Sequence, residues 1–385
     1  MSRIEELMKE LCPQGVEYKP ILDVAEVLYG YPCQAALFNG KENGIPLARI
    51  RDVLAGTTTT YTTEDVPVLY HLQCGDLLVG MDGNFHVGKW KMKTGILCQR
   101  VCKFSSREDE KIILNDYLAH LLPPVMKKLE ESKQSGTVKH LLAKDINAIK
   151  IPVPPIEIQR EIVRVLNNFT ELTTELTAEL TARKKQYEYY RDTLLTFGVH
   201  RRGTFETKWR MLAEIADIGT GSSNTNEAVE DGKYPFFVRS QEPLRKNDYE
   251  YDETAIITAG DGVGVGKVYH YVEGKYALHQ RAYRIHIVAP DVLPRFFFYY
   301  MKAKFLPYIQ KNVFQGSVSS IRRPMLNAFP VPVPDVELQE RIVNVLDNFD
   351  AICSDLNIGL PAEIEARKKQ YEYYRDMLLT FAAAD

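Results

Sequence analysis

One run of the chain places glycines where backbone N–H groups could bind a phosphate. It reads GDGVGVGK over residues 260–267. A Walker A loop requires Gly five residues before its Gly-Lys pair and Ser or Thr directly after the Lys. Asp261 and Val268 occupy those two positions here. The GxGxG spacing also differs from the GxGxxG fingerprint of dinucleotide sites. We therefore expect a tight β-turn that binds no nucleotide.

The motifs of several enzyme classes are missing from the sequence. It has no GxSxG, no HExxH and no carboxylate pair at a telling spacing. Both double prolines follow an apolar residue, Leu122 or Val153, so the Asn/Asp-Pro-Pro-aromatic motif of DNA amino-methyltransferases is absent. The six cysteines form no CxxC pair, which favours free thiols over a zinc site. These absences predict a chain that is not an enzyme on its own and needs no cofactor or metal.

The charge pattern points to nucleic acid, although the net charge of −3 does not. Residues 83–107 contain no acid, and neither do residues 292–334. Basic residues occur throughout both stretches, and Phe85, His86 and Trp90 are interleaved with those of the first. Such a mixture suits a phosphate backbone and base edges. An ordinary solvated face is the alternative for each stretch.

The chain is an internal repeat. Residues 183–197 read RKKQYEYYRDTLLTF and residues 367–381 read RKKQYEYYRDMLLTF, so fourteen of fifteen positions match. Upstream of these copies, residues 151–169 and 331–349 form a second matching pair. Weaker matches pair residues 81–83 with 260–262 and Gln99-Arg100 with Gln280-Arg281. The matching blocks at the ends of the two copies agree in sequence, whereas the residues between these blocks diverge. This pattern is typical of one scaffold that carries two specificities.

Two long helices are predicted by apolar residues that recur every three or four positions. They span about Ile156 to Phe197 and about residue 335 to Phe381, and Gly359 and Pro361 should interrupt the second. The expected helix–helix or subunit interface comprises Leu166, Phe169, Leu176, Tyr187, Tyr190, Leu194, Leu346, Phe349, Leu356, Tyr371, Tyr374 and Leu378.

The predicted fold class is α+β: two mixed α/β domains separated by two long antiparallel coiled-coil helices, with pseudo-two-fold symmetry. The expected domains are residues 1–155 and 199–334, and the helical segments are 156–198 and 335–385. Short β-rich runs such as 76–79 and 255–258 support the mixed domains. A two-fold arrangement should bring the two termini together. No apolar run could span a membrane and no signal peptide begins the chain, so we expect a cytoplasmic protein.

These motifs resemble the DNA-specificity subunit of type I restriction–modification systems. The resemblance rests on residues 135–138 and 316–318, each followed by a Pro-Val-Pro strand end and a Glu-x-Gln-x-x-Ile-Val helix start. It covers the whole chain and implies two target-recognition domains, each reading half of a bipartite double-stranded DNA site. Two modification subunits and the restriction subunits would then supply methylation, translocation and cleavage.

Candidate DNA-binding residues lie near the matched turns and basic stretches. They are Arg49, Arg51, Asn84, His86, Lys89, Lys91, Lys93, Arg100, Thr137, Lys139, Arg239, Gln241, Lys267, Arg281, Ser317, Ser319, Ser320, Arg322 and Arg323. Arg100 and Arg281 should play matched roles, and a structural salt bridge is the alternative for both. Two other functions stay open: a methyltransferase fused to a recognition domain, and a coiled-coil adaptor that binds protein without DNA specificity.

Overall fold

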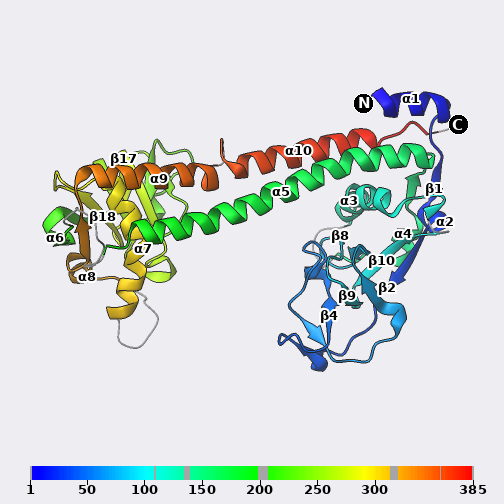
Figure 1. Ribbon diagram of the computed structural model, residues 1–385, viewed down its shortest axis with the longest axis horizontal. Coiled ribbons are helices and arrows are strands. Elements are labelled where there is room, and N and C mark those ends of the chain that lie inside the picture. Colours follow the sequence, from blue (N-terminus) through cyan, green and yellow to red (C-terminus); the bar gives the residue numbers. More distant parts are fainter. Residues whose placement is uncertain are drawn as a thin grey trace. The chain divides into compact units, whose positions relative to one another are not determined.

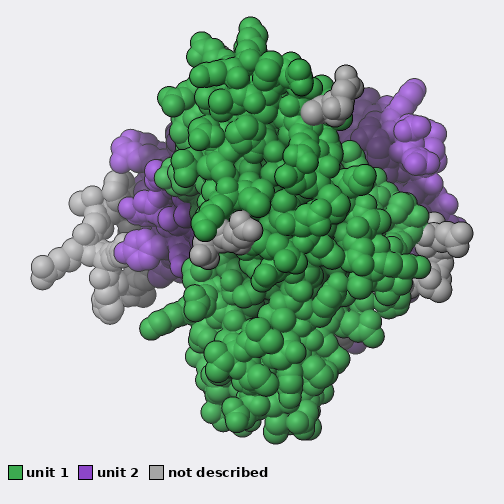
Figure 2. All heavy atoms as spheres, turned by 90° about the vertical axis from the view of Figure 1, so that its right-hand side faces the viewer, with its two compact units in different colours: residues 1–175, 364–385 green, residues 176–363 purple. Residues whose placement is uncertain are grey.

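The computed structural model describes residues 2–107, 110–133, 139–197, 207–312, 320–355 and 357–383. Its contacts divide the chain into two compact units, shown in different colours in Figure 2. Unit 1 contains residues 1–175 and 364–385, and unit 2 contains residues 176–363. Each unit therefore combines a globular part with portions of the long helices.

Unit 1 contains two larger sheets and a strand pair. The first sheet has the order β2-β10-β7-β8, formed by Ala25–Tyr29, Val101–Ser106, Leu77–Gly80 and Val87–Lys89. The second has the order β3-β5-β4-β9-β6, formed by Phe38–Asn39, Tyr61–Thr62, Ile45–Ala48, Thr94–Leu97 and His71–Gln73. Strands β1 (Tyr18–Pro20) and β11 (Lys150–Pro152) pair antiparallel. In the second sheet β4 and β9 run parallel, so their carboxyl ends reach the same edge.

The helices of unit 1 bury its core. They are α1 (Ser2–Leu11), α2 (Ile21–Val24), α3 (Asn115–Glu131), α4 (Ala143–Asn147), the first half of α5 (Ile156–Leu194) and most of α10 (Leu360–Leu378). Apolar side chains of α2, α3, α5 and the first sheet meet in one cluster, which includes Ile21, Leu118, Ile162 and Leu77. The amphipathic stripe of α5 thus supplies part of the globular core.

Unit 2 repeats the order of elements with one continuous sheet. Its order is β13-β18-β16-β17-β14-β15, formed by Ala216–Thr220, Ala282–Ile287, Tyr251–Ala259, Tyr269–Leu278, Tyr234–Phe237 and Leu244–Lys246. Strands β12 (Lys208–Met211) and β19 (Pro330–Val333) pair as β1 and β11 do. The helices of unit 2 are α6 (Leu212–Ile215), α7 (Pro294–Asn312), α8 (Arg323–Asn327), α9 (Val336–Ser354) and the second half of α5.

The sheets of the two units differ at Trp90. Strand β17 is continuous in unit 2, whereas its counterpart in unit 1 is broken into β8 and β9. Trp90 lies between those two strands and is fully buried. Its indole Nε1–H donates to the Thr94 carbonyl at 3.0 Å, and Gly95 leaves room for the ring. A Cβ at residue 95 would lie 2.7 Å from the indole, so the Trp90 ring can pack against the chain here only because residue 95 is glycine.

The long helices pack against each other within each unit (Figure 1). In unit 1 the ring of Phe169 on α5 stacks on Tyr374 of α10, with centroids 5.3 Å apart. In unit 2 Tyr190 of α5 stacks on Phe349 of α9 at 5.6 Å. The long helices therefore contact each other in both units. Both the α+β class and the helix pairing are confirmed.

The second long helix is interrupted where Gly359 and Pro361 predict it. Helix α9 ends at Ser354 and α10 begins at Leu360. The Asp355 carboxylate accepts hydrogen bonds from the N–H groups of Asn357 and Ile358. A Cβ at residue 359 would lie 2.5 Å from the Ala351 carbonyl oxygen, so only glycine fits there. The first helix ends at Leu194, three residues earlier than predicted.

The predicted helix-seam residues divide between the cores of the two units. Leu166, Tyr371, Tyr374 and Leu378 pack in the core of unit 1. Tyr187, Leu194 and Leu346 pack in that of unit 2, and Phe349 contacts the rings of Tyr187 and Tyr190. Leu176 is half-buried, whereas Leu356 lies outside the described residues.

The two ends of the chain pair within unit 1. Val16 and Ala383 form an isolated parallel bridge, and the Val16 N–H donates to the Ala382 carbonyl at 2.9 Å. The Tyr18 hydroxyl donates to the Phe381 carbonyl at 3.2 Å. The expected proximity of the termini is therefore observed, and Figure 1 marks both ends.

Candidate nucleic-acid interface

One hollow of unit 1 collects five predicted DNA-binding residues. Arg49, Arg51, Asn84, His86 and Arg100 line a depression of about 600 Å³. The topology explains why residues so far apart in sequence meet here. Arg49 follows β4 directly, and Arg100 lies in the turn after β9, which runs parallel to β4. Asn84 and His86 lie in the loop between β7 and β8.

Matched glycines let the chain cross closely at this edge in both units. A Cβ at Gly30, just after β2, would lie 2.0 Å from the Cys98 carbonyl oxygen. A Cβ at Gly221, just after β13, would lie 1.8 Å from that of Leu278. Any side chain at either position would therefore displace the strand end that carries Arg100 or Arg281.

Arg100 is held by its backbone and by an ion pair. It adopts φ +71°, a left-handed conformation that non-glycine residues rarely occupy. The Met81 N–H donates to its carbonyl at 2.8 Å. Its guanidinium lies 3.4 Å from the Asp82 carboxylate, which also lies 2.7 Å from His140 Nδ1. The side chain of Arg100 remains 60% exposed, so it faces solvent while it is anchored.

Unit 2 repeats this arrangement around Arg281. The Gly260 N–H donates to the Arg281 carbonyl at 2.9 Å. The Asp261 carboxylate lies 3.2 Å from the guanidinium of Arg281 and 2.7 Å from that of Arg239. Burial would raise the pKa of the Asp261 carboxyl, but the ion pairs with Arg239 and Arg281 hold that pKa below its usual value. Arg281 is 61% exposed, as Arg100 is in unit 1.

The internal repeat predicts that Arg100 and Arg281 occupy matched positions, but it does not predict which carboxylates they contact. The Asp-Gly pair recurs in both copies, so Asp82 and Asp261 stood in the matched turns without a role. His140, the second partner of Asp82, carried no signal, because unit 2 places Ser320 at the corresponding bridge.

The glycine-rich run forms the expected turn. Gly262–Gly264 is a single turn of 3-10 helix, and Gly262 and Gly266 adopt φ +77° and +68°. Lys267 follows this turn and is exposed. Gln241 is exposed in the loop after β14, near Arg239 in sequence. Arg239, Gln241 and Lys267 are therefore all presented by turns of unit 2.

The predicted DNA-binding residues differ in their contacts and exposure. Arg49 binds the Asp52 carboxylate at 3.2 Å and the Thr60 hydroxyl, while Arg51 is exposed. Lys89 pairs with Asp116 at 2.5 Å and Lys139 with Glu130 at 3.6 Å. The candidates exposed elsewhere in loops or at helix starts are Lys91, Lys93, Ser320, Arg322 and Arg323. Thr137, Ser317 and Ser319 lie outside the described residues.

Two of the three interleaved residues do not face solvent as the charge pattern suggested. Phe85 and Trp90 are buried in unit 1 and pack in its clusters. Arg295, in the second acid-free stretch, pairs with Asp347 at 2.8 Å and lies over the ring of Tyr271. An acid-free stretch thus contributes partly to the interior, because apolar and aromatic neighbours decide which residues are buried.

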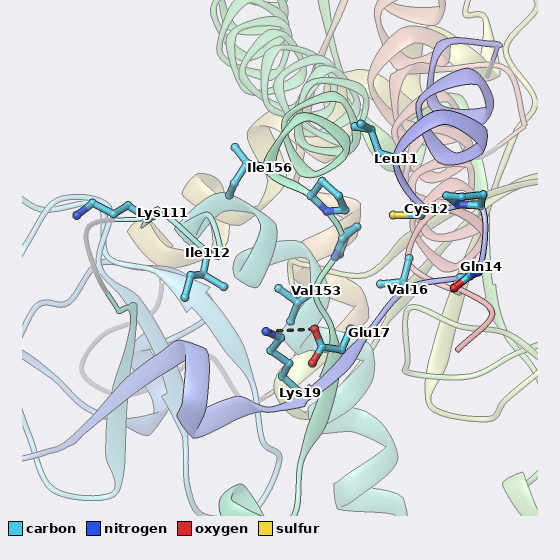
Figure 3. Close-up of a pocket in the computed structure, with 14 residues that line it drawn as sticks. Leu11, Cys12, Gln14, Val16, Glu17, Lys19, Lys111, Ile112, Val153 and Ile156 are labelled. Atoms are coloured by element: carbon cyan, nitrogen blue, oxygen red, sulfur yellow. Dashed lines mark ion pairs between the residues drawn. The ribbon is translucent and has the colours of Figure 1, made fainter. Parts of the chain in front are cut away.

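A second hollow of unit 1 lies apart from these residues. Figure 3 shows its lining, which comes from the segment after α1, from Lys111 and Ile112, and from residues 153–156. Glu17 and Lys19 form an ion pair of 3.2 Å at its edge. No predicted DNA-binding residue lines it. Within the described ranges, no His, Cys, Asp and Glu cluster could hold a metal ion. None of the helices described there is long and apolar enough to cross a membrane.

Comparisons with known proteins agree with the repeat. The type I restriction modification DNA specificity domain matches the chain twice, at residues 13–183 and 206–366. The specificity subunit of the type I restriction enzyme EcoR124I/EcoR124II from Escherichia coli is 33% identical over 309 residues, which are 72% of this chain and 73% of that protein. The MpnII specificity subunit from Mycoplasma pneumoniae is 29% identical over 213 residues, 52% of this chain and 62% of its own.

A solved structure shares the fold. The crystal structure of the type I restriction–modification S subunit from M. genitalium matches with a TM-score of 0.59 at 14% identity, over 94% of this chain and 95% of that chain. Its α+β architecture is therefore that of this chain as well. The chain belongs to the family of type I restriction–modification DNA-specificity subunits, which recognise the DNA target and are not themselves catalytic.

Proposed function

We propose that the chain reads a bipartite DNA site, with one half-site for each globular domain. The domains are residues 1–155 and 199–334, and the helical segments 156–198 and 335–385 set the spacer between the half-sites. The single observation that carries this proposal is the pair of matched edges at Arg100 and Arg281. Each edge presents an exposed arginine beside polar residues that differ between the units.

The neighbours of the two arginines are the candidate base contacts. In unit 1 they are Arg49, Arg51, Asn84 and His86, which share one hollow with Arg100. In unit 2 the candidate is Arg239, which shares the Asp261 carboxylate with Arg281, together with the exposed Gln241 and Lys267 from the turns described above. Side chains that differ in donors and acceptors suit different base edges in the major groove. Half-sites of different sequence follow from this divergence.

The same proposal covers the partners. Two modification subunits would dock on the two repeated helix surfaces, one for each half of the pseudo-symmetric scaffold. They would supply methyl transfer, and restriction subunits would supply translocation and cleavage, in the cytoplasm. The Escherichia coli relative bears the name of such a restriction enzyme's specificity subunit, which supports this assembly.

Duplex binding by the full chain, measured from about 50 to 200 mM salt, tests the proposal against a protein-binding adaptor. Phosphate contacts give a linear fall of log K with log salt, whereas an adaptor binds no duplex. Methylome sequencing of the host, with and without this chain, then identifies the motif. We expect a motif with two separated halves that disappears with the chain. A methylome that is identical in both strains would refute the proposal.

A further inference from the structure

We infer that Asp82 and Asp261 are positioning residues that aim Arg100 and Arg281 at the DNA phosphate backbone, one in each half-site. This inference rests on the proposed function, because it requires that both units bind DNA. It adds two residues that sequence reasoning left without a role, and it separates a constant part of the interface from a variable part.

The two Asp–Arg pairs are built in the same way. Each arginine lies in the turn after the strand that pairs in parallel with β4 or β14. Each aspartate lies one residue after the N–H that binds the arginine carbonyl. The residue before each aspartate then accepts a backbone hydrogen bond of 2.7 Å, from Leu141 in unit 1 and Ile321 in unit 2. The backbone, and not only the side chains, thus fixes each pair.

What differs between the units is the second partner of the aspartate. In unit 1 it is His140, from the segment before α4. In unit 2 it is Arg239, from the loop after β14, and Ser320 stands at the bridge position of His140. The Asp–Arg pair is therefore common to the two units, whereas the polar residues around it differ between them.

A constant feature suits what the two half-sites share. Base edges differ between half-sites of different sequence, but the phosphate backbone is the same in both. Arginine carries five N–H donors in a planar fork, so one edge can bind a carboxylate while others bind phosphate oxygens. We therefore assign Arg100 and Arg281 to phosphates, and the divergent neighbours to bases.

The exposures of the paired groups match this role. The Asp82 and Asp261 side chains are 17% and 26% exposed, whereas those of Arg100 and Arg281 are 60% and 61% exposed. The carboxylate thus lies behind its arginine. An arginine restrained in this way before binding loses less side-chain entropy when a phosphate arrives. Arg100 also has a left-handed backbone, which Arg281 does not share, and such a conformation persists only where surrounding contacts enforce it.

The Asp82→Asn variant distinguishes a positioning role from a simple charge effect, because the two predict opposite changes in DNA-binding affinity. Removing a negative charge beside DNA should tighten binding if only charge matters. If Asp82 positions Arg100, the same substitution should weaken binding, by about threefold. The full-length chain is titrated with a fluorescent 30-base-pair duplex of random sequence at several salt concentrations. Asp261→Asn is the matched test in unit 2.

Arginine variants identify the contact as a phosphate. Arg100→Gln and Arg281→Gln should each weaken binding roughly tenfold. Each should also lower the slope of log K against log salt by about 0.9, and by the same amount on duplexes of different sequence. In the Arg100→Gln background, Asp82→Asn should no longer weaken binding. Asp65→Asn, which removes an exposed acid from the same unit, is the charge control and should not weaken binding.

Three results would overturn the inference. One is tighter binding by both Asp variants, as for a pure charge effect. Another is an arginine effect confined to one DNA sequence, which would indicate a base contact. The third is a loss caused by Asp82→Asn that is unchanged when Arg100 is Gln. Thermal unfolding of each variant checks that it folds. If a unit 1 variant does not fold, the matched variants Asp261→Asn and Arg281→Gln in unit 2 test the inference instead. A wild-type chain that binds no duplex would instead refute the proposed function itself.

Discussion

Gln159 and Gln339 make the same three hydrogen bonds in the two units. The Gln159 carbonyl oxygen accepts from the Leu114 N–H at 2.9 Å, and its amide donates to the carbonyls of Ile112 and Pro154 at 2.9 and 2.7 Å. The Gln339 side chain bonds to the Leu293 N–H and to the carbonyls of Asp291 and Pro334, each at 2.8 Å. Both side chains are fully buried. Each ties the start of a long helix to the start of α3 or α7.

We predict that Gln159→Leu and Gln339→Leu each destabilise the chain by about 2–4 kcal/mol. Leucine fills a similar volume but removes all three hydrogen bonds, of which the one to the Pro154 or Pro334 carbonyl is buried and the other two are partly buried. Urea unfolding followed by circular dichroism measures the loss. Gln73→Leu, at an exposed position, is the control and should change stability by less than about 0.5 kcal/mol. Equal stability of the buried and exposed variants would contradict the prediction.

A second prediction concerns pH and His120. Its ring lies 2.8 Å from the Asn167 side-chain oxygen and 2.9 Å from the Tyr371 hydroxyl, where α3, α5 and α10 meet. Burial lowers the pKa of His120 below its usual value, so the folded state disfavours the charged ring. The unfolded chain then binds the proton more readily. The contribution of His120 to the free energy of unfolding is therefore fully present above the pKa of the unfolded chain, about 6.5, and is lost as the pH falls below that value.

His120→Gln should remove this part of the pH dependence. Glutamine retains a donor and an acceptor but does not titrate. The free energy of unfolding should therefore fall less between pH 7 and pH 5 in the variant than in the wild type. The charges nearest His120, on Lys89, Asp116 and Arg375, are the same in both chains, so the difference isolates the ring. Two parallel pH profiles would show that His120 does not contribute.

The scaffold could be predicted from the sequence better than the site could, because the contacts of the site join residues that lie far apart in the sequence. Periodicity and backbone chemistry are local, so the long helices and the break at Gly359 could be predicted. The burial of Trp90 depends on the small Gly95, and the pairing of Asp82 with Arg100 depends on the crossing of distant strands. The repeat placed Asp82 and Asp261 in matched turns. Only the folded sheet shows which arginine each one contacts.

A third prediction is that the isolated chain transfers no methyl groups. The family assignment and the absence of methyltransferase motifs from the sequence give the reason. Purified chain is incubated with duplex DNA and tritiated S-adenosylmethionine, alone and with the modification subunit from the same host. Label should enter DNA only in the combined reaction. Label incorporated by the purified chain alone would contradict both the assignment and the proposed partners.

A fourth prediction is that specificity is modular. Replacing about residues 208–329 with the equivalent segment of a relative should change one half of the methylated motif and leave the other unchanged. The two units have separate cores, so a replaced sheet keeps its own packing. Methylome sequencing of the host that carries the chimera measures the outcome. The reciprocal replacement of residues 19–150 is the control and should alter the other half. A change in both halves from either replacement would argue against modular reading.

The last prediction concerns the length of α5. Thr177 lies between Phe169, which stacks on Tyr374 in unit 1, and Tyr190, which stacks on Phe349 in unit 2. Four residues inserted after Thr177 lengthen the helix by roughly 6 Å, since each residue adds about 1.5 Å. Base pairs rise about 3.4 Å each along one strand. If α5 sets the spacer, the preferred spacer should grow by one or two base pairs while both half-sites keep their bases. Substituting Thr177 by Ala without an insertion should leave the whole motif unchanged. A methylome in which the insertion altered half-site bases and kept the spacer would show that α5 does not measure the distance.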